Sequence, residues 1–375
     1  MNKTIFFFAG ELSGDLHGAR LLQKIKNFRC IGVGGPRMRS ENFQCIVPME
    51  EFQVMGFTDV ILNLPRLFKL FFKIRNIILS QNPEGVVLID YPGFNIRMAQ
   101  SLRKKGYQGK IIQYIAPSVW AWKHKRVYKM AKSLDVLLTI FPFESEYFSQ
   151  TTLPVPYVGN PLVHTINQYE YDEDWRKRYN LPAHNKILSI FPGSRASEIE
   201  QNLHRQIIAA LKFIEHNPSY KLAISLADEK LRVNIEQKLK ALKIKAPIVT
   251  ANDHYELMNS SSMSIASSGT VSLELALHRT PTVITYSMTP LNWLVAKYLF
   301  RIDLPFYCIV NITCEYEVFP EAIGLNISSE EIFKKLIYLK QNHTRCQEGC
   351  DKLKTILGED NSSEKASKII QGLIC

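Results

Sequence analysis

Short apolar runs of strand length recur along this chain, and each is followed by Gly, Ser or Pro and then by a segment with helical spacing. The runs lie at 4–9, 86–89, 111–115 and 136–140 in the first half and at 187–191, 221–226, 263–266 and 282–285 in the second. Most of their side chains are Val, Ile, Leu and Phe, which is typical of strands buried on both faces. The alternation predicts an α/β fold in which parallel strands are joined by crossover helices.

The sequence indicates a domain boundary near residue 162. Three prolines lie in the segment 151–161, and a polar, charged stretch at 167–178 precedes the next strand. After about residue 330 the strand pattern stops and helical segments remain. The 375 residues are enough for two domains with full hydrophobic cores. We therefore expect a first domain at 1–162, a second at 163–342, and a helical tail at 343–375 that can cross back onto the first domain.

Lys and Arg outnumber Asp and Glu by 46 to 35, so the formal net charge is +11. This surplus favours an anionic partner, whether nucleic acid, a phosphorylated metabolite or an acidic membrane surface, and charge alone does not choose among them. The seven cysteines include no C-x-x-C pair, which argues for reduced thiols and against a zinc site. Charged residues interrupt every apolar stretch before it reaches membrane-spanning length, and 4–9 is expected to be a first strand rather than a signal peptide.

Two turns between a strand and a helix in the second half have the composition of an anion-binding site. Gly193-Ser194-Arg195 follows the strand 187–191, and an arginine beside a helix N-terminus can neutralise a departing diphosphate. Ser268-Gly269-Thr270 follows the strand 263–266, and Glu274 lies one turn into the next helix, where a carboxylate can accept hydrogen bonds from ribose. Helix capping and an ordinary surface arginine are the alternative interpretations.

Two turns in the first half are also candidates. The first strand leads into Gly10-Glu11-Leu12-Ser13-Gly14-Asp15, whose glycines allow an anion or a polar sugar to approach as a helix begins. The spacing is not G-x-G-x-x-G, so a dinucleotide site is not favoured, and a simple turn with Ser13 as N-cap is the alternative. Asp90 follows the strand 86–89 at the edge where open α/β sheets bind ligands. It could act as a general base, or it could serve only the local turn.

Two further segments combine aromatic and basic residues. The run 114–126 holds Trp120 and Trp122 among basic side chains, which fits a nucleic-acid surface, a sugar platform or a rigid turn. The segment 64–79 has large apolar residues and cations at helical spacing, which fits either a core-facing helix or an anchor in the membrane interface. Its candidate membrane-contact residues are Arg66, Phe68, Lys69, Phe72 and Lys73.

Seven short segments, taken in order, closely resemble the lipid A disaccharide synthase family. They are 10–15, 34–38, 55–57, 89–95, 117–122, 192–195 and 268–270. The resemblance covers nearly the whole chain, and the run Pro-Ser-Val-Trp-Ala-Trp at 117–122 is highly specific to that family. It implies a glycosyltransferase of the GT-B class, in which two Rossmann-like domains face a cleft.

The resemblance implies inverting transfer of a sugar from UDP-2,3-diacylglucosamine to the 6-hydroxyl of 2,3-diacylglucosamine 1-phosphate, giving UDP and the β-1′,6-linked disaccharide of lipid A. Asp90 would be the base. The donor site would comprise Gly193, Ser194, Arg195, Ser268, Gly269, Thr270, Glu274 and Asn311. Loops on the acceptor side would supply Gly10, Glu11, Ser13, Gly14, Asp15, Ser118 and Trp120. No Asp-x-Asp pair stands out as a metal clamp, so we expect no metal and no cofactor.

Because both substrates carry acyl chains, the resemblance implies a cytoplasmic protein held peripherally on the anionic inner face of the cytoplasmic membrane, with the segment 64–79 as contact. It implies no nucleic-acid partner and leaves a homodimer open. Two rival interpretations remain: another UDP-sugar transferase or an epimerase of the same architecture, and a basic RNA-binding protein. The cations are dispersed and no nucleic-acid motif occurs, which argues against the second rival.

Overall fold

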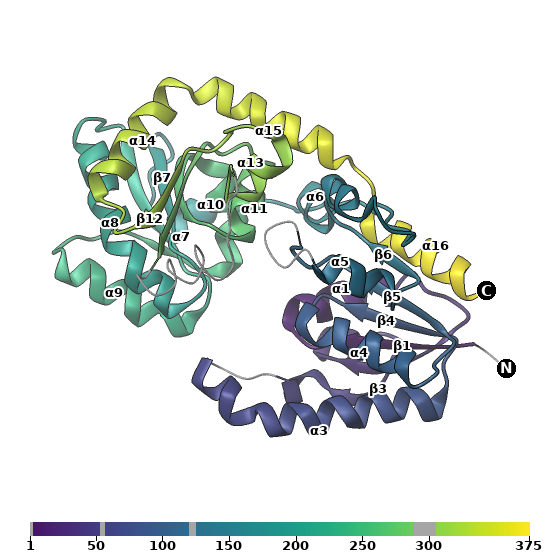
Figure 1. The fold of residues 1–375 in the computed structure, drawn as a ribbon. Coiled ribbons are helices and arrows are strands. Elements are labelled where there is room, and N and C mark those ends of the chain that lie inside the picture. Colours follow the sequence, from purple (N-terminus) through teal and green to yellow (C-terminus); the bar gives the residue numbers. More distant parts are fainter. Residues whose placement is uncertain (1–2, 53–56, 120–124, 289–304) are drawn as a thin grey trace. The chain divides into compact units, whose positions relative to one another are not determined.

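The computed structural model describes residues 3–52, 57–119, 125–288 and 305–375, which fold into two units (Figure 1). The first unit comprises residues 1–164 and 359–375, and the second comprises residues 165–358. Each unit has a six-stranded sheet in which every described pair of neighbouring strands is parallel. The α/β class predicted from the sequence is therefore confirmed.

The sheet of the first unit has the strand order β3-β2-β1-β4-β5-β6. Its strands are β1 (Thr4–Ala9), β2 (Arg29–Gly34), β3 (Gln44–Pro48), β4 (Gly85–Ile89), β5 (Lys110–Tyr114) and β6 (Val136–Leu138). This is the order of a Rossmann-type sheet, in which the direction of winding reverses between β1 and β4. Because Ala9 pairs with Ile89, the loops that follow these two strands emerge side by side.

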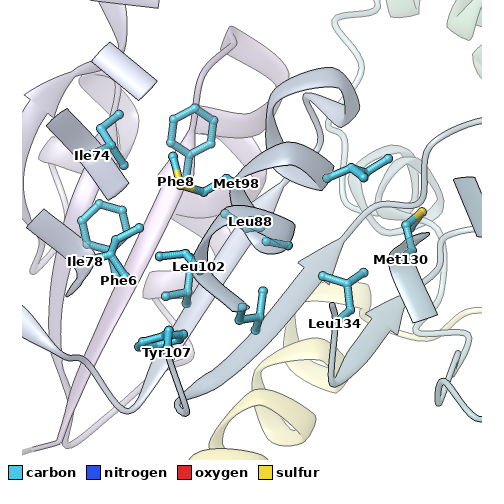
Figure 2. Packing of buried hydrophobic residues seen from close by; sticks show 14 of the residues in the cluster. Phe6, Phe8, Ile74, Ile78, Leu88, Met98, Leu102, Tyr107, Met130 and Leu134 are labelled. Carbon is cyan, nitrogen blue, oxygen red and sulfur yellow. The ribbon is translucent and has the colours of Figure 1, made fainter. Parts of the chain in front are cut away.

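Helices cover both faces of this sheet because its strands are apolar on both sides. One layer consists of α3 (Phe57–Gln81), α4 (Pro92–Lys104) and α5 (Lys125–Ala131), and the other of α1 (Leu12–Leu22), α2 (Pro36–Arg39) and α16 (Ser362–Ile374). Phe6 and Phe8 of β1 pack under the first layer (Figure 2). Ile5 and Phe7 pack under the second. Two 3-10 helices, η1 (Met49–Phe52) and η2 (Pro142–Phe148), complete the described elements of this unit.

The second unit repeats the plan with the order β12-β11-β10-β7-β8-β9, and its winding reverses between β7 and β10. The strands are β7 (Lys186–Phe191), β8 (Tyr220–Ser225), β9 (Ile248–Val249), β10 (Ser261–Ser267), β11 (Thr282–Met288) and β12 (Glu321–Leu325). The helices are α7 (Trp175–Arg178), α8 (Ala196–Glu215), α9 (Arg232–Ala241), α10 (His254–Ser260), α11 (Thr270–Leu277), α13 (Ile309–Cys314), α14 (Ser329–Gln341) and α15 (His343–Leu357), with 3-10 helices η3 (Glu229–Leu231) and η4 (Ala251–Asp253). The helix α6 (Pro161–Asn167) spans the first unit boundary.

The C-terminal boundary differs from the expected one. The helix α15 packs on α11 and α13 and buries Leu353 and Leu357, so it belongs to the second unit. Gly358, with φ of +64°, ends α15, and α16 then packs on α1 and β5 of the first unit. The helical tail expected at 343–375 is therefore divided at Gly358, because only its last helix has an apolar face buried in the first unit.

The backbone conformation and close packing at Gly32 in β2 exclude any side chain. Its φ is +143°, and a Cβ there would lie 2.0 Å from the main-chain oxygen of Phe7 in the paired strand β1. We predict that Gly32→Ala lowers the free energy of unfolding by about 3 kcal/mol or more, because a paired strand cannot move aside.

The matched control is Gly372→Ala in α16, where no atom lies within 4 Å of the added Cβ. It should change stability by less than about 1 kcal/mol. Urea denaturation of both variants measures the difference, and equal midpoints would contradict the account of β2.

Candidate functional site

The second unit holds a cavity of about 450 Å³ at the carboxyl ends of β7, β8 and β10. Open α/β sheets bind ligands at this edge, where the winding reverses. The lining residues are Phe191, Pro192, Gly193, Ser194, Arg195, Glu198, Ser225, Leu226, Ala227, Ala251, His254, Met258, Ser267, Ser268, Gly269, Thr270, Val271 and Glu274. All the residues expected in the donor site except Asn311 thus line one cavity.

The turn between β7 and α8 is built around Gly193. Its φ is +117°, and a Cβ there would lie 2.4 Å from a carboxylate oxygen of Glu198. Glu198 accepts a hydrogen bond from the Ser194 main-chain N–H (3.0 Å) and pairs with the Arg195 guanidinium (3.1 Å). Because the Arg195 side chain is 78% exposed, this ion pair is weak, and the guanidinium is free to turn to a bound anion.

The second turn joins β10 to α11, whose first residue is Thr270. The positive end of the helix dipole and the small residues before it favour a phosphate group at this point. Glu274 lies one turn further on and accepts a hydrogen bond from the Tyr255 hydroxyl at 3.2 Å. Burial raises the pKa of the Glu274 carboxyl. A carboxyl group held in this way can bond to the hydroxyl groups of a sugar.

The cavity also contains residues that the sequence did not reveal. Glu198 could have been predicted as a partner of Arg195, since it lies in the first turn of α8 and three residues after that arginine. His254 could not have been predicted from its neighbours in the sequence. Its ring lies 4.3 Å from that of Tyr255, and its Nδ1 bonds to the carbonyl oxygen of Ala251. Only the tertiary fold brings α10 to the cavity, so local patterning cannot mark this histidine.

Asp90 lies in the first unit, just after β4. Asp90 and Tyr91 are both left-handed, with φ of +49° and +47°, which is a strained conformation for two successive residues. The buried amides of Asn95 and Gln113 both donate to the main-chain oxygen of Asp90 and thereby fix this turn. The Ser13 hydroxyl, at the start of α1, donates to a carboxylate oxygen of Asp90 at 3.1 Å. The sheet edge thus brings the two candidate turns of this unit together.

The loop after β1 contains both exposed and structural residues. Glu11 and Ser13 are exposed, and the negative charge of Glu11 adds to the effect of burial in raising the pKa of Tyr91. Gly10 and Gly14 are buried, Gly10 beside the ring of Tyr91 and Gly14 against β1. Ser118 is exposed, whereas Trp120 lies outside the described residues.

Asp15 has a structural role. It is 1% exposed, and its carboxylate accepts hydrogen bonds from three main-chain N–H groups at the start of α2, those of Gly35 (2.8 Å), Arg37 (3.0 Å) and Met38 (3.0 Å). The carboxylate caps that helix from α1, so it is already occupied by the protein itself.

Asn311 does not line the cavity. It is fully buried, and its amide oxygen accepts hydrogen bonds from the main-chain N–H groups of Val318 and Phe319, both at 2.9 Å. Its amide nitrogen donates to the Phe319 carbonyl oxygen and to the Glu321 carboxylate, both at 2.8 Å. Its hydrogen bonds brace α13 against the start of β12, away from the residues that line the cavity.

The helix α3 has two faces. Leu70, Ile74 and Ile78 are buried in the core of the first unit. The opposite face exposes Phe68 (56%) and Phe72 (46%). The basic candidates Arg66, Lys69 and Lys73 are exposed as well. The core-facing and surface-contact interpretations of this segment therefore apply to opposite faces of one helix.

The described part of the chain shows neither a metal-binding cluster nor a membrane-spanning helix. No group of three or more His, Cys, Asp or Glu side chains within 3–52, 57–119, 125–288 and 305–375 is arranged to hold a metal ion. Asp172 and Asp174 have Asp-x-Asp spacing, but they pair with Arg178 and Lys177. None of the helices in the described part of the chain combines the length and apolar character needed to cross a bilayer.

The sequence matches the family described as lipid-A-disaccharide synthetase over residues 5–372. The lipid-A-disaccharide synthase of Chlamydia pneumoniae is 39% identical over 379 residues, which cover 98% of this chain and 62% of that protein. The one of Coxiella burnetii is 30% identical and covers 100% of this chain and 99% of that protein. The chain therefore spans less than two-thirds of the length of its chlamydial relatives and nearly all of the Coxiella one.

Solved structures show the same fold at low sequence identity. The UDP-GlcNAc 2-epimerase of Methanocaldococcus jannaschii has a TM-score of 0.62 at 15% identity, covering 98% of this chain and 99% of that chain. The trehalose-phosphate synthase of Burkholderia xenovorans has a TM-score of 0.58 at 12% identity, covering 99% of each chain. These likenesses confirm the GT-B-like fold class and its two Rossmann-like domains.

The hydrogen bonds of Asp15 lead to a test of its structural role. We predict that Asp15→Ala lowers the free energy of unfolding of the first unit by about 3 kcal/mol, because it leaves three N–H groups without their charged acceptor. Asp360→Ala is the control, since it removes only a solvent-exposed pair with Lys365 and should cost less than about 1 kcal/mol. Guanidinium denaturation compares them, and an unchanged midpoint for Asp15→Ala would contradict the structural role.

Proposed function

The chain belongs to the lipid-A-disaccharide synthetase family, and from this premise we propose that it is an inverting glycosyltransferase. This membership confirms the family that the sequence motifs resemble. The proposed reaction joins UDP-2,3-diacylglucosamine to 2,3-diacylglucosamine 1-phosphate and releases UDP. The observation that carries the proposal is that one cavity gathers Arg195, Glu274 and the starts of α8 and α11.

We propose that this cavity binds the UDP part of the donor. Two helix N-termini and the exposed Arg195 guanidinium supply the positive potential that a diphosphate needs, and Glu274 supplies an acceptor for ribose hydroxyls. The cavity is large enough for a nucleotide. The M. jannaschii epimerase of similar fold was solved in complex with UDP-GlcNAc and UDP, which supports a UDP-sugar ligand for this architecture.

In the proposed chemistry, the Asp90 carboxylate accepts the proton of the acceptor 6-hydroxyl as that oxygen bonds to the anomeric carbon. The bond from that carbon to the UDP oxygen breaks, and its electron pair leaves with the diphosphate, where Arg195 and the helix starts stabilise the charge. Attack on the face opposite the leaving group inverts the anomeric configuration. The Ser13 hydroxyl and the left-handed turn at Asp90 hold the base for this step.

We predict that Asp90→Asn lowers kcat about 10²–10⁴-fold, because it keeps the size and the Ser13 contact but removes the base. UDP affinity should be unchanged, since Asp90 lies in the first unit. Arg195→Ala should instead weaken UDP binding as well as turnover. Arg279→Ala, at an exposed arginine just after the C-terminus of α11, is the control. Steady-state kinetics and calorimetry with UDP distinguish the two roles, and near-normal turnover in both variants would refute the assignment.

We propose further that α3 holds the protein on the anionic cytoplasmic face of the inner membrane, where both acylated substrates reside. Exposed Phe68 and Phe72 can enter the acyl boundary, while Lys69 and Lys73 meet the headgroups. Such a helix supports reversible attachment without a membrane span.

The membrane contact is tested with Phe72→Glu combined with Lys69→Glu. Lys69→Glu reverses a charge and removes about 1 kcal/mol or more of attraction to anionic lipid, and Phe72→Glu replaces an apolar ring by a second carboxylate. Vesicle partitioning should therefore fall at least tenfold while UDP binding is retained. Tyr338→Glu with Lys334→Glu on the exposed face of α14 is the matched control. Cosedimentation with anionic vesicles measures the effect. Unchanged partitioning of the α3 variant would assign α3 to core packing alone.

A further inference from the structure

The carboxylate of Glu198 binds two of the groups that the proposed donor site offers to a diphosphate. One of its oxygens accepts a hydrogen bond from the main-chain N–H of Ser194 at 3.0 Å, and the other pairs with the Arg195 guanidinium at 3.1 Å. Carboxylates and phosphates accept charge-assisted hydrogen bonds from the same kinds of donor. The protein therefore places an anion of its own at the position where the proposed function places the phosphates.

The turn after β7 is shaped to receive this carboxylate. A Cβ added at Gly193 would lie 2.4 Å from a carboxylate oxygen of Glu198 and 2.8 Å from its Cβ, so the glutamate side chain lies directly against the turn. Its side chain remains 23% exposed, and it lines the cavity together with the turn. The carboxylate thus lies between the main chain of the turn and the space that a ligand would enter.

The main chain around Glu198 is fixed from behind the cavity. The amide of Asn202 donates to the main-chain oxygen of Glu198 at 3.0 Å and accepts a hydrogen bond from the main-chain N–H of Ser287 in β11 at 3.1 Å. The buried Ser267 hydroxyl donates to the main-chain oxygen of Pro192 at 2.7 Å, which ties the two turns of the cavity together. The carboxylate can therefore leave its two donors by rotation about side-chain bonds alone, while the turns stay in place.

The charges around the cavity oppose a diphosphate as long as the Glu198 carboxylate keeps this position. Among the described residues, the titratable side chains of the lining are Arg195, Glu198, His254 and Glu274. The ion pair with Glu198 compensates the charge of the Arg195 guanidinium, and the lining includes a second carboxyl group, that of Glu274. A diphosphate at this position would meet a like charge. Rotation of the Glu198 side chain away from the turn would free both donors for phosphate oxygens.

We propose that Glu198 is an internal competitor of the donor diphosphate. Its carboxylate holds the Ser194 N–H and the Arg195 guanidinium until phosphate oxygens replace it, and it returns to them as UDP leaves. Glu198 thereby limits the affinity for UDP and favours release of this product, and it takes no part in the bond changes at the anomeric carbon. This inference rests on the proposed function, which assigns the UDP part of the donor to this cavity.

The test compares Glu198→Gln with Glu200→Gln. The first variant keeps the size of the side chain and an oxygen that can accept from Ser194, but it removes the competing charge. The second is the matched control, since it removes the same charge from an exposed residue of α8 that pairs with Lys238 and does not line the cavity. By calorimetry, the Kd of the Glu198 variant for UDP should fall about tenfold, while that of the control stays within about twofold of wild type. In steady-state kinetics, UDP should become a correspondingly stronger product inhibitor of the Glu198 variant.

Uridine separates the effect of charge from a general change in the cavity. It carries no phosphate, so its affinity, measured by competition with UDP, should be the same in wild type and in both variants. Glu198→Ala provides a second removal of the charge and should also tighten UDP binding. Circular dichroism reports whether each variant is folded.

Three results would overturn the inference. If the folded Glu198 variants bind UDP as wild type does or more weakly, Glu198 only supports the turn, and the proposed donor site stands. If uridine and UDP gain affinity equally, the substitution has changed the cavity and not a competition for phosphate donors. If wild type binds no UDP, the proposed function of the cavity fails together with this inference.

Discussion

The chemistry available to this chain depends on the two strand pairings at which its sheets reverse their winding, β1 with β4 and β7 with β10. These strands are buried on both faces, so a slip of one residue would expose an apolar row and is strongly disfavoured. Pairing Ala9 with Ile89 brings Ser13 to Asp90. Pairing Phe191 with Ala266 brings the turns at Gly193 and Gly269 to one cavity.

Internal hydrogen bonding separates structural from functional polar groups in this molecule. Asp15 and Asn311 are buried and hydrogen-bond to main-chain groups, which is typical of a structural role. Arg195 and Asp90 differ. Among the residues that the structure describes, the Arg195 guanidinium forms only a weak exposed ion pair, and the Asp90 carboxylate accepts a single hydroxyl contact. For Asp90, the buried bonds go to the main chain instead, where Asn95 and Gln113 hold its strained turn. The main chain at Asp90 is therefore held by buried hydrogen bonds, while its carboxylate stays available to react.

Much of the fold and of the cavity lining was predictable from the sequence, because strands and turns are marked by residues that are close together in the chain. The apolar runs at 4–9 and 187–191 became β1 and β7, and the Gly, Ser and Arg residues after them lie where a parallel sheet gathers loop residues. His254 was missed because no local pattern links α10 to the turns after β7 and β10. The bracing role of Asn311 could not be predicted, because a buried bracing amide and a ligand-binding amide look alike in sequence. The boundary at Gly358 depends on which core the apolar face of α15 joins, and amphipathic spacing gives no partner.

The central claim is that the purified chain transfers diacylglucosamine from UDP to diacylglucosamine 1-phosphate and releases UDP. Its most direct measurement is UDP release from UDP-diacylglucosamine with and without diacylglucosamine 1-phosphate, followed by mass analysis of the lipid. The account predicts release that depends on the acceptor, with one disaccharide 1-phosphate formed for each UDP. A folded protein that binds UDP but gives no disaccharide, or that releases UDP equally without acceptor, would contradict it.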